Sequence, residues 1–572
     1  MSLPLYQVET NILPISTLLQ VFSGLAFTLL ICFIDQNSIG LALPKIGQDL
    51  NCASTIAWAG TSALIANTVF QVLYGRLSDI FGRKIVFLVS VGLLAGGDLL
   101  CSFAHTGPEL YIFRAIAGIG GGGVTALSMM IVSDVVTLEN RGKYQGILGS
   151  CVGLGNMIGP FMAAGFIEHN TWRAIFWCIS PLAALSGVVV GVILPPNKVT
   201  GDLKSKARAI DYFGVATSSI AIVLLLIPIS GAGTYFVWSS PLVVSMLVSG
   251  SLLAILFVIV EWKVAPFPMM PLRIFHNRAV AAILIQNFLF GIVYYSHLYY
   301  LPIFYQNALQ YSPITAAALT IPFVAGQSCF SILSGQYISR FKRYGEVIWF
   351  GFTIWTLGTA LVAGLFTQGI SNWKAALILF LEGAGVGNVF QPTLVAAQAH
   401  SEKHDRAVVI GVRNFLRSLG GAIGLAMSSA IYSNVLTNAV TSPSTNLPFG
   451  FAAQILDSIL YVPNLDSLTA EQKNVVLDSY MASSHVVFIM WVPMMGVCLL
   501  LCSLIKDKGL KRPGEDEEKE GKRAAENRSA DASDQNLTIK SDLELGNLTV
   551  EQPKILDQEI MVVQQQKQYM ES

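Results

Sequence analysis

Ionisable side chains inside long apolar stretches are the feature of this sequence most able to do chemistry. Asp35, Asp98, Arg114 and Glu382 each interrupt an apolar stretch of about the 20 residues that a helix needs to cross a bilayer. A charge at that depth is costly unless it faces a water-filled cavity or an opposite charge. A buried acid can alternate between neutral and ionised forms. Asp35 and Glu382, with Arg114 as a cation, are therefore predicted to bind protons or substrate.

Each of these residues also has an interpretation without a function. Asp35 could cap a helix end near the membrane surface. Arg114 lies near the start of its stretch and could extend its guanidinium to the interface. Glu382 begins a glycine run, and the sequence favours neither a functional nor a structural role for it. Asp98, near the outer end of its stretch, is expected at the membrane interface.

The composition predicts a protein that crosses the membrane many times. Hydrophobic residues make up 53% of the 572 residues and charged residues 12%, and the mean hydropathy is +0.59. A soluble domain carries about twice that share of charge. The net charge of zero offers no basis for binding nucleic acid. Eight cysteines lie mainly in apolar stretches without metal-ligand spacing, so neither a metal nor a cofactor is expected.

Fourteen apolar stretches are predicted to be membrane-spanning helices. Lys and Arg are concentrated in alternate connections between them, which places both termini in the cytoplasm. The long connection 433–484 then falls on the outer face, and its Leu, Ile and Val content indicates a partly ordered cap. The predicted spans are 21–43, 56–74, 85–104, 110–132, 143–167, 174–194, 212–230, 240–260, 280–305, 314–338, 347–367, 375–397, 407–432 and 485–505.

An internal repeat indicates that the chain has two related halves. A shift of 265 positions superposes Gly146 on Gly411 and five further glycines of the first half on five of the second, and each half then has six spans. The remaining pair of spans, 212–230 and 240–260, is an insertion between the halves. Repeats of this kind are typical of secondary transporters, whose binding site lies between the halves near the membrane midplane. The other coinciding glycines are Gly118, Gly120, Gly122, Gly155 and Gly159 with Gly383, Gly385, Gly387, Gly420 and Gly424.

The predicted organisation follows from the spans, the repeat and a change in composition near residue 506. The segment 506–572 is polar and charged with few aromatic residues, so a disordered cytoplasmic tail is expected. Its sequons at Asn527, Asn536 and Asn547 should stay unglycosylated in the cytoplasm. The predicted parts are a cytoplasmic segment 1–20, an N-terminal six-helix half 21–194, a linker with two inserted helices 195–262, a C-terminal six-helix half 263–505 containing the outer loop 433–484, and the tail.

The charged decapeptide GRLSDIFGRK at 75–84 lies between two apolar stretches and is predicted to be a tight cytoplasmic loop. Gly75 and Gly82 are expected to let the backbone turn with positive φ. Asp79 and Arg83 could serve only as a solvated loop that sets the topology. The alternative, which we favour, is a conformational latch in which Asp79 faces a helix N-terminus or an arginine.

A second motif, GLGNMIGPFMAAG at 153–165, combines small residues at helical spacing with a proline. Gly155 and Gly159 permit close helix packing and Pro160 predicts a kink. The run GIGGGG at 118–123 formally matches a dinucleotide-binding fingerprint, but no strand precedes it, so it too indicates helix packing.

Polar and aromatic side chains crowd the span 280–305. An aromatic belt at the membrane interface explains those near its outer end. The deeper ones are candidates to line an amphiphilic cavity that holds flat organic molecules. The candidates are Asn287, Tyr294, Tyr295 and His297.

Several of these motifs resemble those of the major facilitator superfamily, in particular its fourteen-span drug:proton antiporter branch and the fungal toxin-efflux members within it. The resemblance covers about residues 20–505. It implies an all-α major facilitator fold, an exporter motif at Gly155, Gly159 and Pro160, and a cytoplasmic latch at 75–84. The motifs are IDQNSIGLALPKI at 34–46, GRLSDIFGRK at 75–84, YIFRAIAGIGGGG at 111–123, GLGNMIGPFMAAG at 153–165, YYLPIFYQ at 299–306 and GVRNFLRSLGGAIG at 411–424.

The function expected from the resemblance is proton-coupled efflux of small hydrophobic or amphiphilic organic compounds, such as toxic metabolites or drugs, by a monomer in the plasma membrane. The alternative is proton-coupled uptake of a siderophore or amino acid, on the plasma or vacuolar membrane. An integral-membrane enzyme is not expected, because the sequence has no nucleophile with a base and no clustered metal ligands. The repeat favours a transporter over a receptor.

Overall fold

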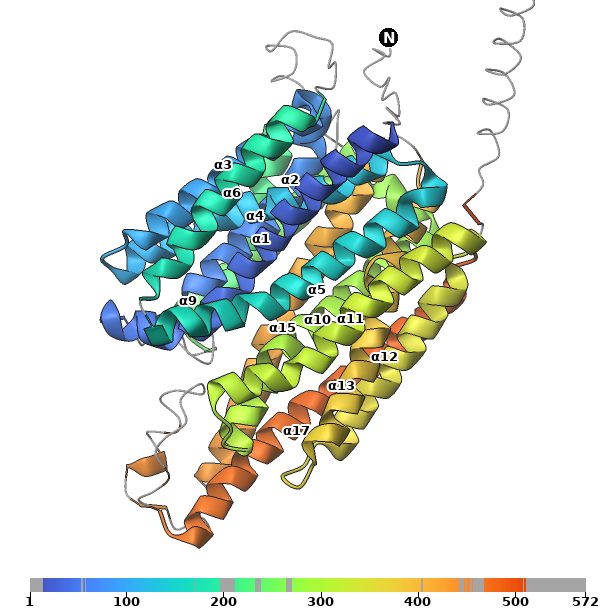
Figure 1. The fold of residues 1–572 in the computed structure, drawn as a ribbon. Coiled ribbons are helices and arrows are strands. Elements are labelled where there is room, and N and C mark those ends of the chain that lie inside the picture. Colours follow the sequence, from blue (N-terminus) through green and yellow to red (C-terminus); the bar gives the residue numbers. More distant parts are fainter. Residues whose placement is uncertain are drawn as a thin grey trace, which may run out of the picture. The chain divides into compact units, whose positions relative to one another are not determined.

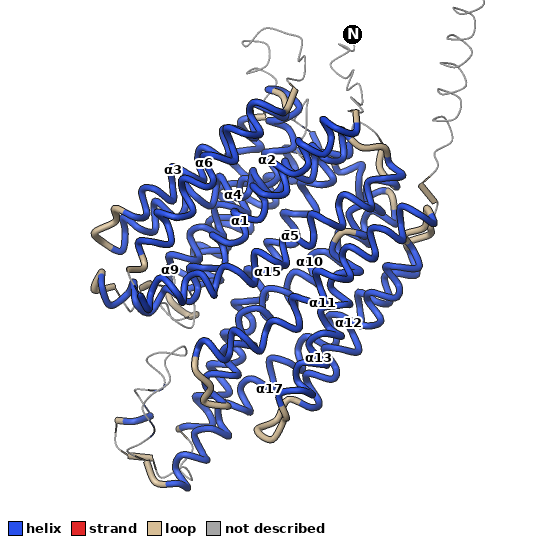
Figure 2. The backbone as a smooth tube through the Cα atoms, viewed as in Figure 1, coloured by secondary structure: helices blue, strands red, loops and turns tan. Residues whose placement is uncertain are grey.

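The computed structural model describes most of the chain from residue 14 to residue 510, and all regular structure there is helical (Figures 1 and 2). The predicted tail beyond residue 510, with its three sequons, lies outside the described residues, as does part of the predicted outer loop 433–484. The gaps within the described part are 53–54, 57, 170, 196–210, 232–237, 264–269, 403–404, 442–446, 449, 453–454, 456–464, 466–467 and 508.

Six long helices form the N-terminal half, and six long stretches of helix form the C-terminal half, where the fourth is broken in two because Pro392 has no amide hydrogen to continue it. The first group is α1 (Ile15–Asp49), α2 (Trp58–Phe81), α3 (Arg83–Ser102), α4 (Gly107–Val135), α5 (Leu138–His169) and α6 (Arg173–Ile193). The second is α10 (Arg278–Ile303), α11 (Pro313–Phe341), α12 (Gly345–Leu365), α13 (Asn372–Phe390) with α14 (Pro392–Ala399), α15 (Arg406–Val440) and α17 (Ala470–Leu501). Short turns are η1 (Leu272–His276), η2 (Phe304–Ala308) and η6 (Cys502–Leu504).

Within the described residues, thirteen helices are long and apolar enough to cross a membrane. The predicted second span corresponds to α2, which has 24 residues. At 1.5 Å per residue it is about 36 Å long and therefore sufficient for the roughly 30 Å hydrocarbon core. It is not one of the thirteen, and its residues Asn67, Thr68 and Gln71 are polar and buried. The chain is thus a multi-pass membrane protein.

The prediction of a loop at 75–84 is wrong in most of its length. Helix α2 continues through these residues to Phe81, and α3 begins at Arg83. Only Gly82 turns the chain, with φ of 94°. Gly75 lies within α2 and does not turn the chain. It packs against the backbone of Ala407, whose carbonyl oxygen is 3.3 Å from the position that a Cβ would take. The polar side chains continue the helix because they find partners on neighbouring helices.

The two halves are built by the same set of helix pairs. In the first half α5 packs on α1, α4 packs on α2 and α3, and α6 packs on α1 and α3. In the second half α15 packs on α10, α13 packs on α11 and α12, and α17 packs on α10 and α12. Each half has its own buried apolar cluster. The halves meet where α5 contacts α11 and where α2 contacts α15.

The glycines that coincide in the repeat make matching contacts. Gly155 and Gly159 of α5 lie against the α1 backbone, and Gly420 and Gly424 of α15 lie against the α10 backbone. A Cβ on any of the four would stand within 2.7 Å of a neighbouring atom. Glycine is therefore required at these crossings because no side chain fits.

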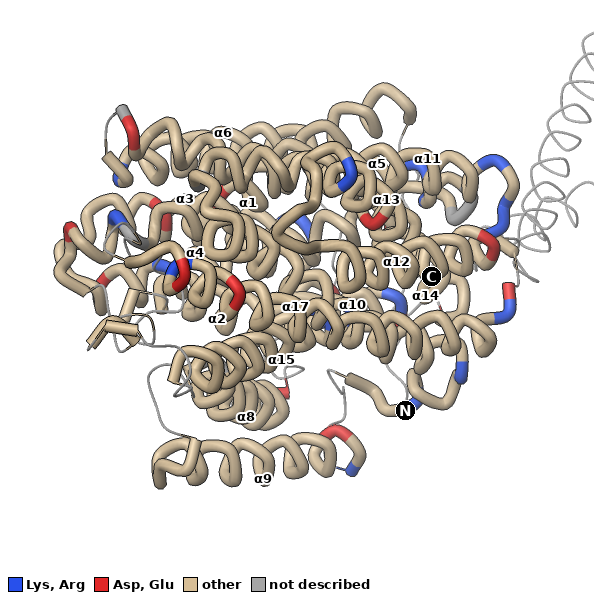
Figure 3. Tube along the Cα trace, turned by 90° about the horizontal axis from the view of Figure 1, so that it is seen from below, with Lys and Arg blue, Asp and Glu red and all other residues tan. Residues whose placement is uncertain are grey.

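Two further helices, α8 (Tyr212–Gly231) and α9 (Pro241–Lys263), correspond to the predicted insertion. Helix α8 packs on α2 and α15, and α9 packs on α8 (Figure 3). Ile222 and Leu226 of α8 join Ile65, Val69 and Ala422 in a small apolar cluster. The pair thus covers one of the two junctions between the halves. The outer face of α9 presents a row of exposed Leu, Ile and Val side chains, suited to lipid.

Candidate functional site

Three of the four intramembrane ionisable residues form one cluster, the aspartate–arginine cluster of Asp35, Asp98 and Arg114. Nη1 of Arg114 lies 2.7 Å from Oδ1 of Asp35 and 3.3 Å from Oδ1 of Asp98. The side chains come from α1, α3 and α4, and the guanidinium stands 5.8 Å from the ring centre of Phe176 on α6. Arg114 is 1% exposed and Asp98 is fully buried. The cluster therefore occupies the interior of the N-terminal half.

Close helix packing positions this cluster. Gly97 of α3 lies against the backbone of Ala117, and Gly120 of α4 lies against the backbone of Leu94. These contacts draw α3 and α4 together beside the ion pairs. The predicted exporter motif contributes from α5, because Gly159 packs on the α1 backbone between Ile34 and Ser38, next to Asp35.

The geometry bears on two interpretations made from sequence. Asp98, which was expected near the membrane interface, is fully buried inside the bundle and pairs with Arg114. Arg114 does not extend to the surface, because its guanidinium is enclosed by the two carboxylates and Phe176. With both acids ionised the cluster carries one negative charge in excess, and one added proton makes it neutral. One bound proton therefore removes the excess charge of this buried cluster.

Glu382 lies apart from that cluster, inside the C-terminal half. Its Oε1 is 3.3 Å from Nδ1 of His297, and both side chains are buried. The structure thus brings together two predicted site residues that sequence could not pair.

The predicted cavity residue Tyr294 belongs to a chain of polar side chains across the two halves. Nδ2 of Asn37 donates to Oδ1 of Asn156 at 2.8 Å, and Nδ2 of Asn156 donates to the Tyr294 hydroxyl at 2.7 Å. That hydroxyl donates to Oε1 of Gln327 at 3.3 Å. The chain links α1, α5, α10 and α11. It places hydrogen-bonding groups where the halves meet, which is where secondary transporters bind substrate.

The other two predicted cavity residues have different surroundings. Asn287 donates from Nδ2 to the carbonyl of Ile283 in its own helix at 2.7 Å. Tyr295 packs edge-on against Tyr294, with 5.5 Å between ring centres, and against Gly421 of α15.

Sequence reasoning missed two buried arginines of α15, Arg413 and Arg417. Their guanidinium carbons lie 5.5 Å and 4.4 Å from the ring centre of Phe390. Arg413 donates to Oδ1 of Asn414 at 3.1 Å, to Oγ1 of Thr393 at 3.3 Å and to the carbonyl of Phe390. Within the described residues neither arginine has a carboxylate at salt-bridge distance.

These arginines lie one helical turn apart and are 1% and 2% exposed. Arg417 is also within electrostatic range of the Tyr294 hydroxyl, which connects the pair to the polar chain between the halves. A signal was present in the sequence, because GVRNFLRSLGGAIG puts two arginines inside a predicted span. Their lack of acidic partners needed the structure.

The predicted latch residues form a network at the ends of α2, α3 and α4 that are predicted to face the cytoplasm. Arg83 pairs with Asp79 at 2.7 Å and with Asp134 at 2.9 Å, and it also donates to Ser78. Asp79 therefore faces an arginine, as one form of the latch hypothesis requires. A conformational role stays a prediction.

The same end of the molecule is where α5 and α11 lie closest. Gly142 faces Gly335, and Gly146 faces the carbonyl of Ser331, whose hydroxyl donates to the Gly146 carbonyl at 2.9 Å. Arg141 donates to Oε1 of Gln398 at 3.3 Å across the halves. These contacts join the two halves on the predicted cytoplasmic side.

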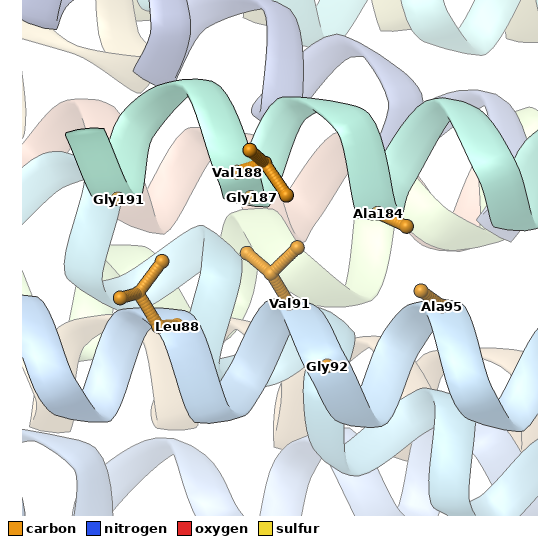
Figure 4. A pocket seen from close by; sticks show the side chains of 8 residues that line it. All are labelled: Leu88, Val91, Gly92, Ala95, Ala184, Gly187, Val188 and Gly191. Atoms are coloured by element: carbon orange, nitrogen blue, oxygen red, sulfur yellow. The ribbon is translucent and has the colours of Figure 1, made fainter. Parts of the chain in front are cut away.

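A separate groove of about 480 Å³ lies between α3 and α6 (Figure 4). Its lining is wholly apolar, and it contains none of the buried charged residues. A groove without polar groups has no means to orient a substrate. We therefore place the site at the junction of the halves. The lining residues are Leu88, Val91, Gly92, Ala95, Ala184, Gly187, Val188 and Gly191.

The fold and these buried charges define a transporter of two six-helix halves. A profile of the Major Facilitator Superfamily matches residues 25–425. The chain belongs to the Major Facilitator Superfamily.

Relatives and solved structures agree with this assignment. The chain is 51% identical to citrate exporter 1 of Yarrowia lipolytica over 504 residues, which cover 88% of this chain and 74% of that one. It is 38% identical to the MFS-type transporter clz4 of Cochliobolus lunatus over 509 residues, 89% of each chain. Its fold is similar to that of the human organic anion transporter MFSD10, with a TM-score of 0.56 at 14% identity, covering 86% of this chain and all of that one.

Proposed function

We propose that this protein exports a small organic anion carrying several carboxylates and that a proton gradient drives the export. The observation that carries the proposal is the buried pair Arg413 and Arg417, which has no carboxylate partner among the described residues. Two buried positive charges on one helix face are costly, because each is removed from water and repels the other. A substrate carboxylate would supply the missing charge.

The chemistry of the two side chains supports carboxylates as the ligand. A guanidinium is planar and offers parallel N–H donors that match the two oxygens of a carboxylate. The unused Nε of each arginine supplies a further donor. Asn414, Thr393 and the polar chain around Tyr294 add hydrogen bonds for remaining oxygens. The 51% identity to a protein named a citrate exporter favours the same class of cargo.

We assign proton coupling to the aspartate–arginine cluster. A proton arriving from outside protonates Asp35 or Asp98 and neutralises the cluster. Its release inward restores the excess negative charge when the cavity is hydrated on that side. The contact of Gly159 with the helix backbone beside Asp35 supports a link between the exporter motif and this cluster. Export implies a site in the plasma membrane, and the protein is proposed to act as a monomer.

A second candidate cargo is a hydrophobic or amphiphilic compound, as the sequence motifs predict. It is favoured by the aromatic rings of Tyr294, Tyr295, Phe323 and Phe390, which lie beside the arginines and the polar chain. Such rings hold flat molecules by stacking. The arginines favour an anion over a neutral compound.

Transport of radiolabelled citrate into liposomes containing the purified protein tests the cargo. We expect Arg417→Ala to weaken citrate affinity about 100-fold, because removing one partner of a buried charge pair typically costs 2–5 kcal/mol. Arg417→Lys should recover part of the citrate affinity, since it restores the positive charge but not the planar guanidinium with its parallel N–H donors. Citrate transport unchanged in Arg417→Ala would contradict the anion site, and transport of a neutral aromatic compound instead would favour the second candidate.

Gradient-driven transport by Asp35 variants tests the coupling. Asp35→Asn conserves volume but removes the acid, so citrate should equilibrate without accumulating against its gradient. Asp35→Glu should keep part of the accumulation, because the acid is present but displaced by one methylene. Wild-type accumulation by Asp35→Asn would contradict the assignment. Export in exchange for protons predicts that citrate accumulates on the more acidic side of the membrane. Accumulation on the more alkaline side would favour uptake together with protons.

A further inference from the structure

A second pair of buried ionisable groups, the His297–Glu382 pair, has each other as its polar partner. Nδ1 of His297 lies 3.3 Å from Oε1 of Glu382, and the side chains are 2% and 0% exposed. Neither ring nitrogen and neither carboxylate oxygen makes a hydrogen bond to another group in the described part of the chain. A purely structural buried pair is normally satisfied by additional hydrogen bonds. This pair keeps its remaining donors and acceptors unused.

The pair occupies the place in the C-terminal half that the aspartate–arginine cluster occupies in the N-terminal half. His297 is on α10 and Glu382 on α13, the counterparts of α1 and α4. Under the 265-residue shift they coincide with Cys32 and Ala117, each one helical turn from a member of that cluster. The aromatic ring that covers the pair comes from α17, as Phe176 of α6 covers Arg114. The two halves thus carry different ionisable groups in matching interiors.

The surroundings of the pair are apolar on nearly every side. The His297 ring stacks on Phe323 of α11, with 4.4 Å between centres and 20° between planes, and it lies 5.2 Å from Trp491 of α17. Gly358 of α12 packs on the side chain of Glu382. Tyr305 of η2 is a further titratable residue that interacts with Glu382.

These surroundings permit only a narrow set of charge states. If the carboxylate is ionised and the imidazole neutral, an isolated negative charge is buried. If both are protonated, an isolated positive charge is buried. One shared proton leaves the pair neutral overall, as a neutral acid beside a neutral imidazole or as an ion pair, and this state costs least in an apolar interior. Losing that proton requires water to reach the pair.

Two tyrosines, Tyr305 and Tyr311, connect the surroundings of this pair with an exposed residue, Asn372. The Tyr305 hydroxyl has no hydrogen-bond partner in the described residues and lies within electrostatic range of Glu382. Its ring stacks on Tyr311, with 6.3 Å between centres, and the Tyr311 hydroxyl donates to Asn372 at an exposed position. Tyr305 also lies in a π-helical turn, a distortion that is frequent at functional sites.

We propose that the His297–Glu382 pair is a second proton site, which takes one proton from the outer water past Tyr305 and releases it when the C-terminal half becomes hydrated on the inner side. Only O–H and N–H bonds form and break, and the proton leaves to water. The pair then sets how transport depends on external pH. This role rests on the proposed proton-driven export, whereas proton binding by the pair does not.

The test uses the full-length protein in liposomes with radiolabelled citrate as the probe. His297→Gln and Glu382→Gln conserve size and remove one titrating group each. His485→Gln on α17 is the matched control, because that histidine is only half-buried and lies outside both clusters. Citrate exchange at equal pH on both sides reports binding and movement. Citrate accumulation across a series of external pH values reports proton coupling.

We expect both variants to retain exchange and to lose the dependence of accumulation on external pH, while His485→Gln follows the wild type. A wild-type pH profile in His297→Gln and Glu382→Gln would overturn the proposal. Absence of citrate exchange by the wild type would contradict the proposed function alone. In that case infrared difference spectra between two pH values decide, because the proposal requires a titrating band, either the C=O band of a carboxylic acid or a band of the imidazolium ring, that is lost from Glu382→Gln and from His297→Gln.

Discussion

The two halves of this transporter share one helical plan but distribute charge in opposite ways. In the N-terminal half Arg114 is enclosed by Asp35 and Asp98, so one buried cation meets two acids. In the C-terminal half Arg413 and Arg417 are equally buried, and neither has a carboxylate at salt-bridge distance among the described residues. One half therefore carries an excess of acid and the other an excess of base.

This difference fits the two tasks of the proton-coupled export that we propose. An excess acid next to a cation suits proton exchange, because adding one proton removes the net charge. Unpaired cations suit an anionic cargo, because the cargo completes the pair. The His297–Glu382 pair gives the C-terminal half its own pair of buried ionisable groups, at the place that matches the acid-rich cluster. The two halves therefore share the arrangement of their helices and differ in their buried charges.

The largest expected effect on stability comes from Arg114→Ala. It leaves two buried carboxylates without a cation, and breaking a buried pair in this way costs about 3–5 kcal/mol. Denaturant titration of the detergent-solubilised protein measures the loss. Unchanged stability would mean that the acids accept protons freely, and the contrast between the halves would then be weaker than we infer.

A smaller effect is expected from the glycines that match between the halves. Gly155→Ala and Gly420→Ala each insert a methyl group at a close helix crossing, and overpacking of this kind costs about 1–3 kcal/mol. The loss should be greater for Gly420→Ala, because its Cβ meets the carbonyl oxygen of Phe288, a backbone atom, at 2.1 Å, whereas Gly155 meets the Cβ of Phe33 at 2.6 Å. The same titration ranks the two. The reverse order would show that α1 and α10 differ in how far they can move.

The two turns that follow α2 and α11 give a finer comparison. Gly82 and Lys342 both have positive φ, 94° and 59°. Gly82→Ala should destabilise the protein by about 1–2 kcal/mol, because a Cβ disfavours this backbone region. Lys342→Gly should have a smaller effect of opposite sign. Thermal unfolding of both variants checks the signs, and destabilisation by Lys342→Gly would show that the contacts of that side chain outweigh its backbone strain.

The smallest effect on stability is expected from Arg417→Met, which we nevertheless expect to impair citrate transport strongly. Removing an unpaired buried charge relieves repulsion from Arg413 and keeps most of the volume, so unfolding should change by less than about 1 kcal/mol. Unfolding and transport are measured on the same preparation. A large loss of stability would show that Arg417 has a structural partner and would remove the contrast with Arg114.

The sequence by itself determined the class of structure. Apolar stretches of spanning length and alternating basic connections predicted an all-helical membrane protein, because hydrophobicity and the distribution of basic residues are local properties of the chain. The glycine repeat predicted two related halves, and the motifs predicted the superfamily that the profile match confirms. The boundary at 75–84 was wrong because charged residues in a short segment do not reveal partners on other helices.

Only the tertiary structure decided which charges meet. Asp98 and Arg114 are 16 residues apart, but Asp35 and Arg114 are 79 apart and His297 and Glu382 are 85 apart, so no local pattern could pair them. The unpaired state of Arg413 and Arg417 is likewise visible only when every neighbouring helix is in place. Burial and pairing are properties of several helices packed together, and these two properties decide whether an ionisable residue binds a proton, binds an anion or supports the fold.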